Sequence, residues 1–430
     1  MPSATPRQDW RVLLAIFWLT SMVEGLGVSQ IFAFLPSYLR EMGVAEPDRL
    51  QFVGLFGALI FVVGMPLVPL WGVWADKYSR KAVIIRSALV EAVVLTAIAL
   101  SREPWQLAAS LLLVGFQLGN TGIMLAAIRD LAPRKQLGTA LGFFGSSGPI
   151  GFAAGPVLGG IIVDTLRWGL PAMFAVSASL SVGTALLLAL GSREVRPEVI
   201  PAGSTLALAF GAVRGVLSDA PTRRIFAIFF VAFLANQVAR PYLPVLVSHI
   251  NGPAGEASAI GLVIGAAALF GAVVGPAGGW LGDRIGYRPV LVAALVGTGV
   301  ASLLMPVAPS VPMLAFIALV AAALYATVAP MVFALLATEV DADRRSQTLN
   351  LVYLPLYVGG IVGPVIASQV VKAGLAAPFL LAAVVYLGGG LLIAAQFRVG
   401  GAGSTGVGGR GAADREAGLA EGAAEGTAPP

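Results

Sequence analysis

Ionisable side chains lie deep inside several long apolar runs of this chain, and Glu24 is the first of them. It stands about 13 residues, or roughly 20 Å of helix, from the beginning of its run. A charge left at that depth in a bilayer costs at least ~2.5–3.5 kcal/mol, which favours the neutral acid. A carboxyl group that gains and loses a proton beside a cavity suits proton coupling, whereas one that stays protonated or paired is structural. We expect Glu24 to be the proton-coupling residue.

Arg240 and Glu91 are two further charges placed inside apolar runs. An arginine at such a depth faces a cavity or a partner, because exposure to lipid is costly. Arg240 could bind an anionic group of a substrate, pair with Glu24, or extend towards the membrane surface. Glu91 could pair with a cation from a neighbouring run or stay protonated.

Amide and aromatic side chains recur in the same apolar runs and could line a cavity for an amphiphilic compound. Most of them could equally form hydrogen bonds between helices. With Arg240, the candidate cavity residues are Gln30, Gln117, Asn120, Asn236, Gln237, Tyr325, Asn350, Tyr353 and Tyr357.

Groups needed for catalysis are scarce. The chain has one histidine and no cysteine, so no catalytic nucleophile of the Ser–His or Cys–His type is expected. No cluster has metal-ligand spacing, and no Gly-x-x-x-x-Gly-Lys-Ser/Thr loop is present to hold nucleotide phosphates. We therefore expect no catalytic residue, no metal site, no cofactor and no enzymatic activity.

The composition indicates that lipid surrounds most of the chain. Hydrophobic residues make up 57%, charged residues 11%, and the mean hydropathy is +0.88, whereas soluble domains carry about 25% charged residues. The net charge of +5 is scattered over short loops, so nucleic-acid binding is not expected. Runs long enough to cross a bilayer lie near 11–36, 50–75, 82–101, 106–129, 137–163, 169–191, 223–249, 258–281, 289–308, 312–338, 347–371 and 375–398.

The loops between these runs predict the topology. If the N-terminus is cytoplasmic, the basic residues on the opposite side are only Arg40, Arg49, Arg102, Arg167 and Lys372. That asymmetry places both termini in the cytoplasm of a multi-pass plasma-membrane protein. We expect a bundle over 1–191, a cytoplasmic linker over 192–222, a second bundle over 223–398 and a disordered tail over 399–430. Residues 203–217 are moderately amphipathic and could lie on the membrane surface or belong to a flexible linker.

Several landmarks occur twice, at nearly one offset of about 207 residues. A short charged loop follows the second run (Gly72-Val73-Trp74-Ala75-Asp76-Lys77-Tyr78-Ser79-Arg80-Lys81) and the eighth (Gly279-Trp280-Leu281-Gly282-Asp283-Arg284-Ile285-Gly286-Tyr287-Arg288). Pro36 corresponds to Pro244, and Gly155-Pro156 corresponds to Gly363-Pro364. The order and common spacing predict a duplicated unit of six spans, with halves related by an axis along the membrane normal.

The paired loops resemble the signature loop of the major facilitator superfamily, Gly-x-x-x-Asp-Arg-x-Gly-Arg-Arg/Lys. Lys77 and Ser79 depart from it in the first copy. The stretch from Gly151 to Gly160 is similar to the Gly-x-x-x-Gly-Pro-x-x-Gly-Gly signature of drug:proton antiporters (multidrug efflux). The resemblance implies an all-α membrane protein of twelve transmembrane helices in two six-helix bundles with pseudo-twofold symmetry, and a cavity lined by spans one, four, seven and ten. Span four lacks the arginine of an Arg-x-x-Gln-Gly-type motif that many such antiporters carry.

The resemblance also implies two sets of mechanical residues. A latch between the halves would use Gly72, Asp76, Arg80, Lys81, Asp130, Gly279, Asp283, Arg284 and Arg288, with Arg80 reaching Asp130. A glycine at position 72 would let span two approach a neighbouring helix closely. A small-residue face for packing against the other half would use Gly151, Gly155, Pro156, Gly159, Gly160, Gly363 and Pro364.

These observations favour a monomeric secondary transporter, with export of small amphiphilic compounds coupled to protons as the leading function. A lipid or glycolipid flippase, and uptake of a sugar or organic anion, remain alternatives on the same fold. The short loops leave little surface for a signalling function, and the shortage of catalytic groups disfavours a membrane-embedded enzyme.

Overall fold

The computed structural model describes residues 9–195, 203–218, 220–339 and 354–401. Within these ranges every regular element is a helix. The N-terminal half comprises α1 (Trp10–Glu41), α2 (Asp48–Val62), α3 (Gly64–Lys77), α4 (Arg80–Leu100), α5 (Pro104–Leu113), η1 (Val114–Phe116), α6 (Asn120–Leu131), η2 (Arg134–Gln136), α7 (Leu137–Gly160), η3 (Ile161–Thr165) and α8 (Gly169–Gly191).

The C-terminal half repeats this arrangement after a connecting helix. The elements are α9 (Thr205–Ser218), α10 (Ala220–Ala239), η4 (Arg240–Tyr242), α11 (Leu243–Asn251), α12 (Glu256–Ile285), α13 (Tyr287–Leu304), η5 (Met305–Val307), α14 (Val311–Ala326), α15 (Val328–Glu339), α17 (Leu354–Val370), η6 (Val371–Ala373) and α18 (Ala377–Gly401). In the described residues these helices form 12 stretches long and apolar enough to cross a bilayer, which confirms the predicted spans. The amphipathic segment near 203–217 contains helix α9.

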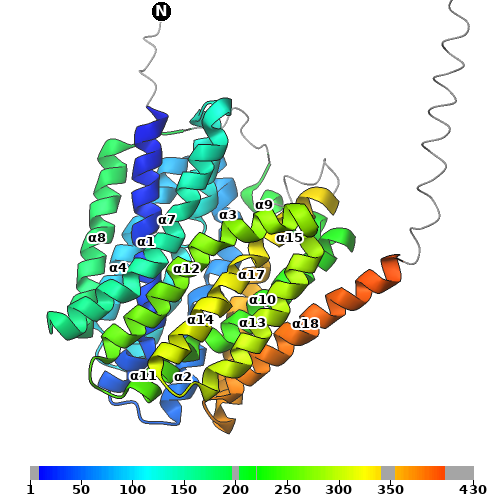
Figure 1. The fold of residues 1–430 in the computed structure, drawn as a ribbon. Helices are drawn as coiled ribbons and strands as arrows, with labels where there is room; N and C mark the ends of the chain where they lie inside the picture. Colours follow the sequence, from blue (N-terminus) through cyan, green and yellow to red (C-terminus); the bar gives the residue numbers. More distant parts are fainter. Residues whose placement is uncertain (1–8, 196–202, 219, 340–353, 402–430) are drawn as a thin grey trace, which may run out of the picture.

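The two halves pack through matching pairs of helices. The α7 helix of the first half lies along α12 of the second, as the ribbon in Figure 1 shows. The α2 helix of the first half packs against α17 of the second. These pairs are span five with span eight, and span two with span eleven. Span eight is the counterpart of span two, and span eleven is the counterpart of span five, so the two contacts are equivalent. The arrangement confirms two six-helix bundles with pseudo-twofold symmetry.

Four spans are interrupted near their centres. Span four breaks between α5 and α6, where Gly119 adopts a left-handed conformation with φ of 99°. Glycine adopts this conformation without the steric cost of a Cβ. Span two breaks at Val63, span seven at η4 next to Pro241, and span ten at Thr327. Discontinuous helices free backbone groups near the midplane, which transporters tolerate where these groups are buried in protein or line a cavity.

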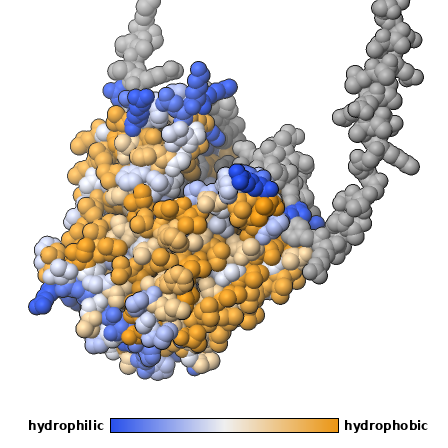
Figure 2. Space-filling model, viewed as in Figure 1, coloured by the Kyte–Doolittle hydropathy of each residue, from blue (hydrophilic) through white to orange (hydrophobic). Residues whose placement is uncertain are grey.

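An apolar belt covers the outer surface. Large aliphatic side chains such as Leu190 (88% exposed) and Val307 (71%) point outward from the helices. Figure 2 shows hydrophobic residues over most of this face and hydrophilic residues gathered at its two ends. Since exposed aliphatic area of this extent is unfavourable in water, the belt is the lipid-facing surface. We call the end where α1 begins the N-terminal end and the opposite end the far end.

Candidate transport site

Glu24 lies at the middle of α1 and is only partly accessible. Its Oε2 accepts a hydrogen bond of 2.8 Å from Nδ2 of Asn120, the first residue of α6. The break in span four therefore positions an amide opposite the α1 carboxyl group. Gln117, on the other side of Gly119, also lies close to Glu24, and so does Arg86 of α4. This cluster brings together three residues predicted from the sequence and one that was assigned elsewhere.

Arg86 is the functional candidate that sequence reasoning missed. It was grouped with the basic residues of a cytoplasmic loop, although it falls inside the predicted span 82–101. In the structure its guanidinium stacks on the Trp71 ring, 3.8 Å from the centroid. One nitrogen lies 3.4 Å from the Leu118 carbonyl oxygen at the break in span four. Arg86 therefore supplies from span three a cation beside span four, which has no arginine of its own at this place.

Gln30 does not line a cavity. It is fully buried within the first half, where its Nε2 donates to the Gly155 carbonyl at 3.2 Å and its Oε1 accepts from Ser177 at 2.6 Å. The side chain therefore ties α1 to α7 and α8. Gln117 and Asn120 are each 1% exposed, so in this conformation they lie beside Glu24 and do not face an open cavity.

Arg240 lies at the junction of the two halves. Its guanidinium sits 4.3 Å from the ring centroid of Phe32 on α1 and 5.2 Å from that of Phe152 on α7. Gln237 of its own span is 3.5 Å away. Tyr325 of span ten also lies near the Arg240 guanidinium. The arginine is held by aromatic rings and does not pair with Glu24.

The remaining candidate cavity residues divide between the halves and their junction. Asn236 lies beside Tyr386 of α18, inside the second bundle. Tyr357 of α17 meets Phe61 of α2 edge-to-face at 6.2 Å between centroids, so it lies at the junction. Asn350 and Tyr353 lie outside the described residues.

The first charged loop contains a buried ion cluster. Arg80 is 3% exposed, and its Nε and Nη1 lie 2.9 Å from Asp76 and 2.7 Å from Asp130. The expected reach from Arg80 to Asp130 is thus confirmed. An arginine buried between two carboxylates links the ends of α3, α4 and α6.

Ser79, which replaces a glycine of the family pattern, begins α4. Its hydroxyl accepts from the Ala82 amide at 2.9 Å, which is an N-cap contact. Glu194, after span six, accepts from the Arg80 amide at 2.9 Å and was not identified from the sequence.

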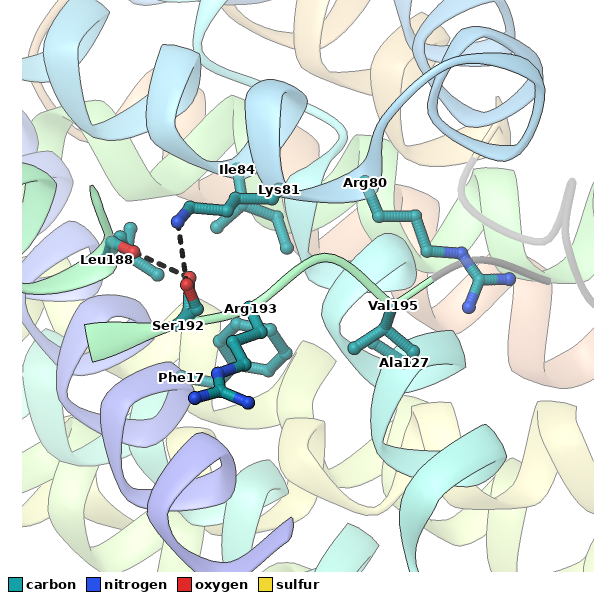
Figure 3. A pocket seen from close by; sticks show the side chains of 9 residues that line it. All are labelled: Phe17, Arg80, Lys81, Ile84, Ala127, Leu188, Ser192, Arg193 and Val195. Carbon is teal, nitrogen blue, oxygen red and sulfur yellow. Dashed lines mark hydrogen bonds between the residues drawn. The ribbon is translucent and has the colours of Figure 1, made fainter. Parts of the chain in front are cut away.

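Lys81 anchors the segment that follows span six. Its Nζ donates to the Ser192 carbonyl at 2.6 Å across a small pocket. Figure 3 shows Lys81 and Arg80 pointing in opposite directions from the start of α4. The pocket lies inside the first half near the loop, at Phe17 and Val195, and is separate from the junction of the halves.

The second loop is more open. Asp283 accepts from the Tyr287 hydroxyl at 2.9 Å, and Arg284 stacks on Trp280 at 3.9 Å. Arg288 is exposed. The prediction that span two approaches a neighbouring helix closely at Gly72 is wrong, because a Cβ at Gly72 would meet nothing within 4 Å. The same holds for Gly279. The tight contacts occur at neighbouring glycines, where a Cβ on Gly64 would be 2.5 Å from Leu118 and one on Gly278 would be 2.3 Å from Thr327.

Most of the small-residue face of α7 packs within its own half, contrary to expectation. A Cβ on Gly151, Gly155 or Gly159 would collide with α1, at distances of 2.1–2.2 Å from Met22, Ser29 and Phe34. A Cβ on Gly363 would likewise come 2.9 Å from Gln237 of its own half. The small residues of this face recur at positions i, i+4 and i+8. This spacing does not determine which neighbouring helix the face packs against.

Other small residues form the contact between halves. A Cβ on Gly160 would lie 2.8 Å from Ser258 of α12, and one on Gly261 would lie 2.4 Å from the Pro156 carbonyl. On the other side of the junction, a Cβ on Gly54 of α2 would lie 2.6 Å from the Pro364 carbonyl of α17. Of the predicted set, Gly160, Pro156 and Pro364 therefore take part in this contact.

An ion pair joins the halves at the far end. Arg40 of α1 contacts both oxygens of Glu256 of α12, at 3.0 and 2.5 Å. Ser37 and Ser248 donate to the same carboxylate, at 3.2 and 2.5 Å. We call Arg40, Glu256, Ser37 and Ser248 the far-end clasp. With Asp164 accepting from the Ser258 amide at 2.6 Å, the clasp closes the far end.

The family model of the Major Facilitator Superfamily matches residues 17–254 and again residues 225–421. Two matches, one for each bundle, together cover most of the sequence. The chain belongs to this superfamily.

Curated relatives agree with this assignment. The multidrug resistance protein MdtG of Citrobacter koseri is 31% identical over 301 residues, which cover 69% of this chain and 72% of the relative. MdtG of Enterobacter lignolyticus is 28% identical over 386 residues, covering 88% and 90%.

Solved structures share the fold at low identity. The nucleoside transporter NupG superposes with a TM-score of 0.73 at 15% identity, over 90% of this chain and 99% of that one. The human organic anion transporter MFSD10 gives 0.65 at 19% identity, over 90% and 100%. This chain is therefore a secondary transporter of small molecules embedded in a membrane, and not an enzyme.

Proposed function

We propose that this protein exports small amphiphilic compounds, drugs among them, in exchange for protons. The observation that carries the proposal is the Glu24 cluster, a carboxyl group at the middle of span one held by Asn120 and near Arg86. A carboxyl group that is partly accessible in mid-membrane can take up a proton from one side and release it to the other. The likeness to MdtG multidrug resistance proteins supports the export of drugs.

The structure is closed at the far end and supports a cycle of alternating access. In this cycle the cytoplasm faces the N-terminal end, where the loops rich in Arg and Lys gather, and both termini are cytoplasmic. The chain acts as a monomer in the plasma membrane. Residues 1–191 and 223–398 rock against each other about the α7–α12 and α2–α17 contacts, with 192–222 as the cytoplasmic linker and 399–430 as a tail.

The Asp76–Arg80–Asp130 cluster and the Asp283 loop latch the N-terminal end when the far end opens. In the present conformation the bonds that Asp76, Asp130 and Asp283 make with described residues lie within their own halves, as in a released latch. Arg240 and Tyr357 lie at the junction of the halves, and Tyr325 lies near Arg240. These three residues form the part of the predicted cavity that meets substrate.

A ligand screen tests the proposal against its alternatives. The purified protein is heated with drugs, lipids and metabolites at two pH values, and ligands that raise the melting temperature are carried into liposome transport assays. We expect amphiphilic drugs to stabilise the protein in a pH-dependent manner. Movement of labelled phospholipid between leaflets, without pH-dependent movement of any drug, would contradict export and favour a flippase.

A further inference from the structure

Glu91 of α4 is a buried acid that has no role in the Glu24 cluster described above. It is 3% exposed. Its Oε1 has no hydrogen-bond partner in the described part of the chain. A carboxyl group kept only for structure would use its oxygens in fixed hydrogen bonds, because an unsatisfied buried polar atom is costly.

The Glu91 side chain reaches across from α4 to α1. A Cβ on Gly27 would lie 2.7 Å from Oε1 of Glu91. Gly27 is three residues after Glu24, and residues three apart are neighbours on one helix face. The absence of a side chain at Gly27 therefore lets the second carboxyl group lie one turn from the first.

Among the described residues, Arg86 supplies the one positive charge that acts on these two acids. The α5 and α8 helices, which pack against α4, contain no charged residue along their length. The α8 helix presents the Ser181 hydroxyl to Glu91, and α3 places Trp71 under Arg86. Arg86 on α4 lies near Glu24. One cation can balance one carboxylate, so two charged acids here would repel each other.

A hydrogen-bond donor lies close to both acids. The Nε2 of Gln117 is buried and meets no hydrogen-bond acceptor among the described residues in this conformation. It lies near Glu24 and near Glu91. An amide in this position can donate to whichever carboxylate is charged.

We propose that Glu91 is a second proton-exchanging residue, which shares one proton with Glu24. In the exchange the O–H bond of the Glu91 acid breaks and a new one forms on Glu24, so that Glu91 becomes the carboxylate and the total charge is unchanged. Glu24, which is partly accessible, exchanges a further proton with water, while the pair keeps the shared one. The role in coupling rests on the proposed function, whereas the shared proton does not.

Infrared spectroscopy tests the shared proton without any substrate. Purified protein in lipid is titrated with acid and base, and the C=O band of each protonated carboxyl group is assigned with Glu24→Gln and Glu91→Gln. For a coupled pair we expect each substitution to move the titration midpoint of the other band by about one pH unit or more. Glu41→Gln, at the far end of α1, serves as the control and should move neither band. A Glu91 band that does not titrate, or that keeps its midpoint in Glu24→Gln, would overturn the proposal.

Gly27→Ala gives an independent variant that keeps both acids. The added methyl group meets the end of a flexible side chain, so we expect the protein to fold with the Glu91 band displaced. Gly183→Ala on α8, where a Cβ meets nothing within 4 Å, is the matched control. An unchanged Glu91 band in folded Gly27→Ala would also count against the proposal. Failure of proton-coupled export with the bands still coupled would overturn the proposed function alone.

Discussion

At the scale of residues, position along the chain identifies an acid in mid-membrane but not its partners. Glu24 could be singled out because a carboxyl group is rare inside an apolar run, and the Arg80–Asp130 contact followed from the family motif. The roles of Arg86 and Glu194 depend on contacts between helices far apart in sequence, which periodicity does not encode. Gln30 was misassigned for the same reason. An amide inside an apolar run has the same sequence pattern whether it faces a cavity or a neighbouring helix.

Arg86 should be required for coupling because it is the cation close to Glu24. We predict that Arg86→Gln lowers substrate accumulation driven by a pH gradient at least about tenfold, equivalent to roughly 1.4 kcal/mol. Arg86→Lys should restore it only in part, because an ammonium group lacks the planar face that stacks on Trp71. Arg134→Gln, at an exposed side chain of η2, is the control. Equal transport by Arg86→Gln and the control would exclude this role.

At the scale of elements, hydropathy predicts the spans well and their interruptions poorly. The 12 spans follow from runs of apolar residues, since a bilayer requires about 20 of them. The break at Gly119 has only a glycine as its signal, in a chain with 53 glycines. The partner of the α7 small-residue face could not be predicted either, because close packing on α1 and on α12 requires the same small side chains.

The far-end clasp should stabilise the conformation in which that end is closed. Glu256→Gln removes the charge that Arg40 contacts, and the pair is only partly buried, with side-chain exposures of 46% for Arg40 and 9% for Glu256. We expect a loss of about 1 kcal/mol, or roughly a fivefold shift towards opening at this end. Spin labels on cysteines introduced at the far ends of α1 and α12 would report it as a longer distance, since the chain has no native cysteine.

Glu46→Gln is the matched control for the clasp. Glu46 pairs with Arg49 at the same end but within one half. Its loss should leave the distances unchanged. If Glu256→Gln and Glu46→Gln give the same distance distributions, the clasp does not hold the halves together.

At the scale of the whole molecule, duplication produces two halves that touch through α7–α12 and α2–α17. Small residues let the backbones approach at these contacts, and the far end adds an ion pair. In the described residues, the carboxylates of the two charged loops bond within their own halves, Asp76 to Arg80 and Asp283 to Tyr287. A molecule with one end fastened and the other released is suited to rocking.

The latch predicts that Asp76 affects the balance of conformations more than substrate binding. Asp76→Asn removes one of the two carboxylates on Arg80. We expect the state closed at the N-terminal end to lose about 1 kcal/mol, a roughly fivefold change in population. Spin-label distances across the N-terminal end would measure the shift, with exposed Lys135→Gln as the control. Substrate affinity that falls while the distances stay the same would assign Asp76 to binding instead.

The central claim is that protons entering at Glu24 drive export. Everted membrane vesicles with an acidic lumen are incubated with a drug identified by the stability screen, and its uptake into the lumen is followed with wild type, Glu24→Gln and the control Glu41→Gln. We predict that Glu24→Gln abolishes uptake driven by the pH gradient while drug still equilibrates down its own gradient, and that Glu41→Gln behaves as wild type. Gradient-driven uptake by Glu24→Gln at the wild-type rate would contradict the account.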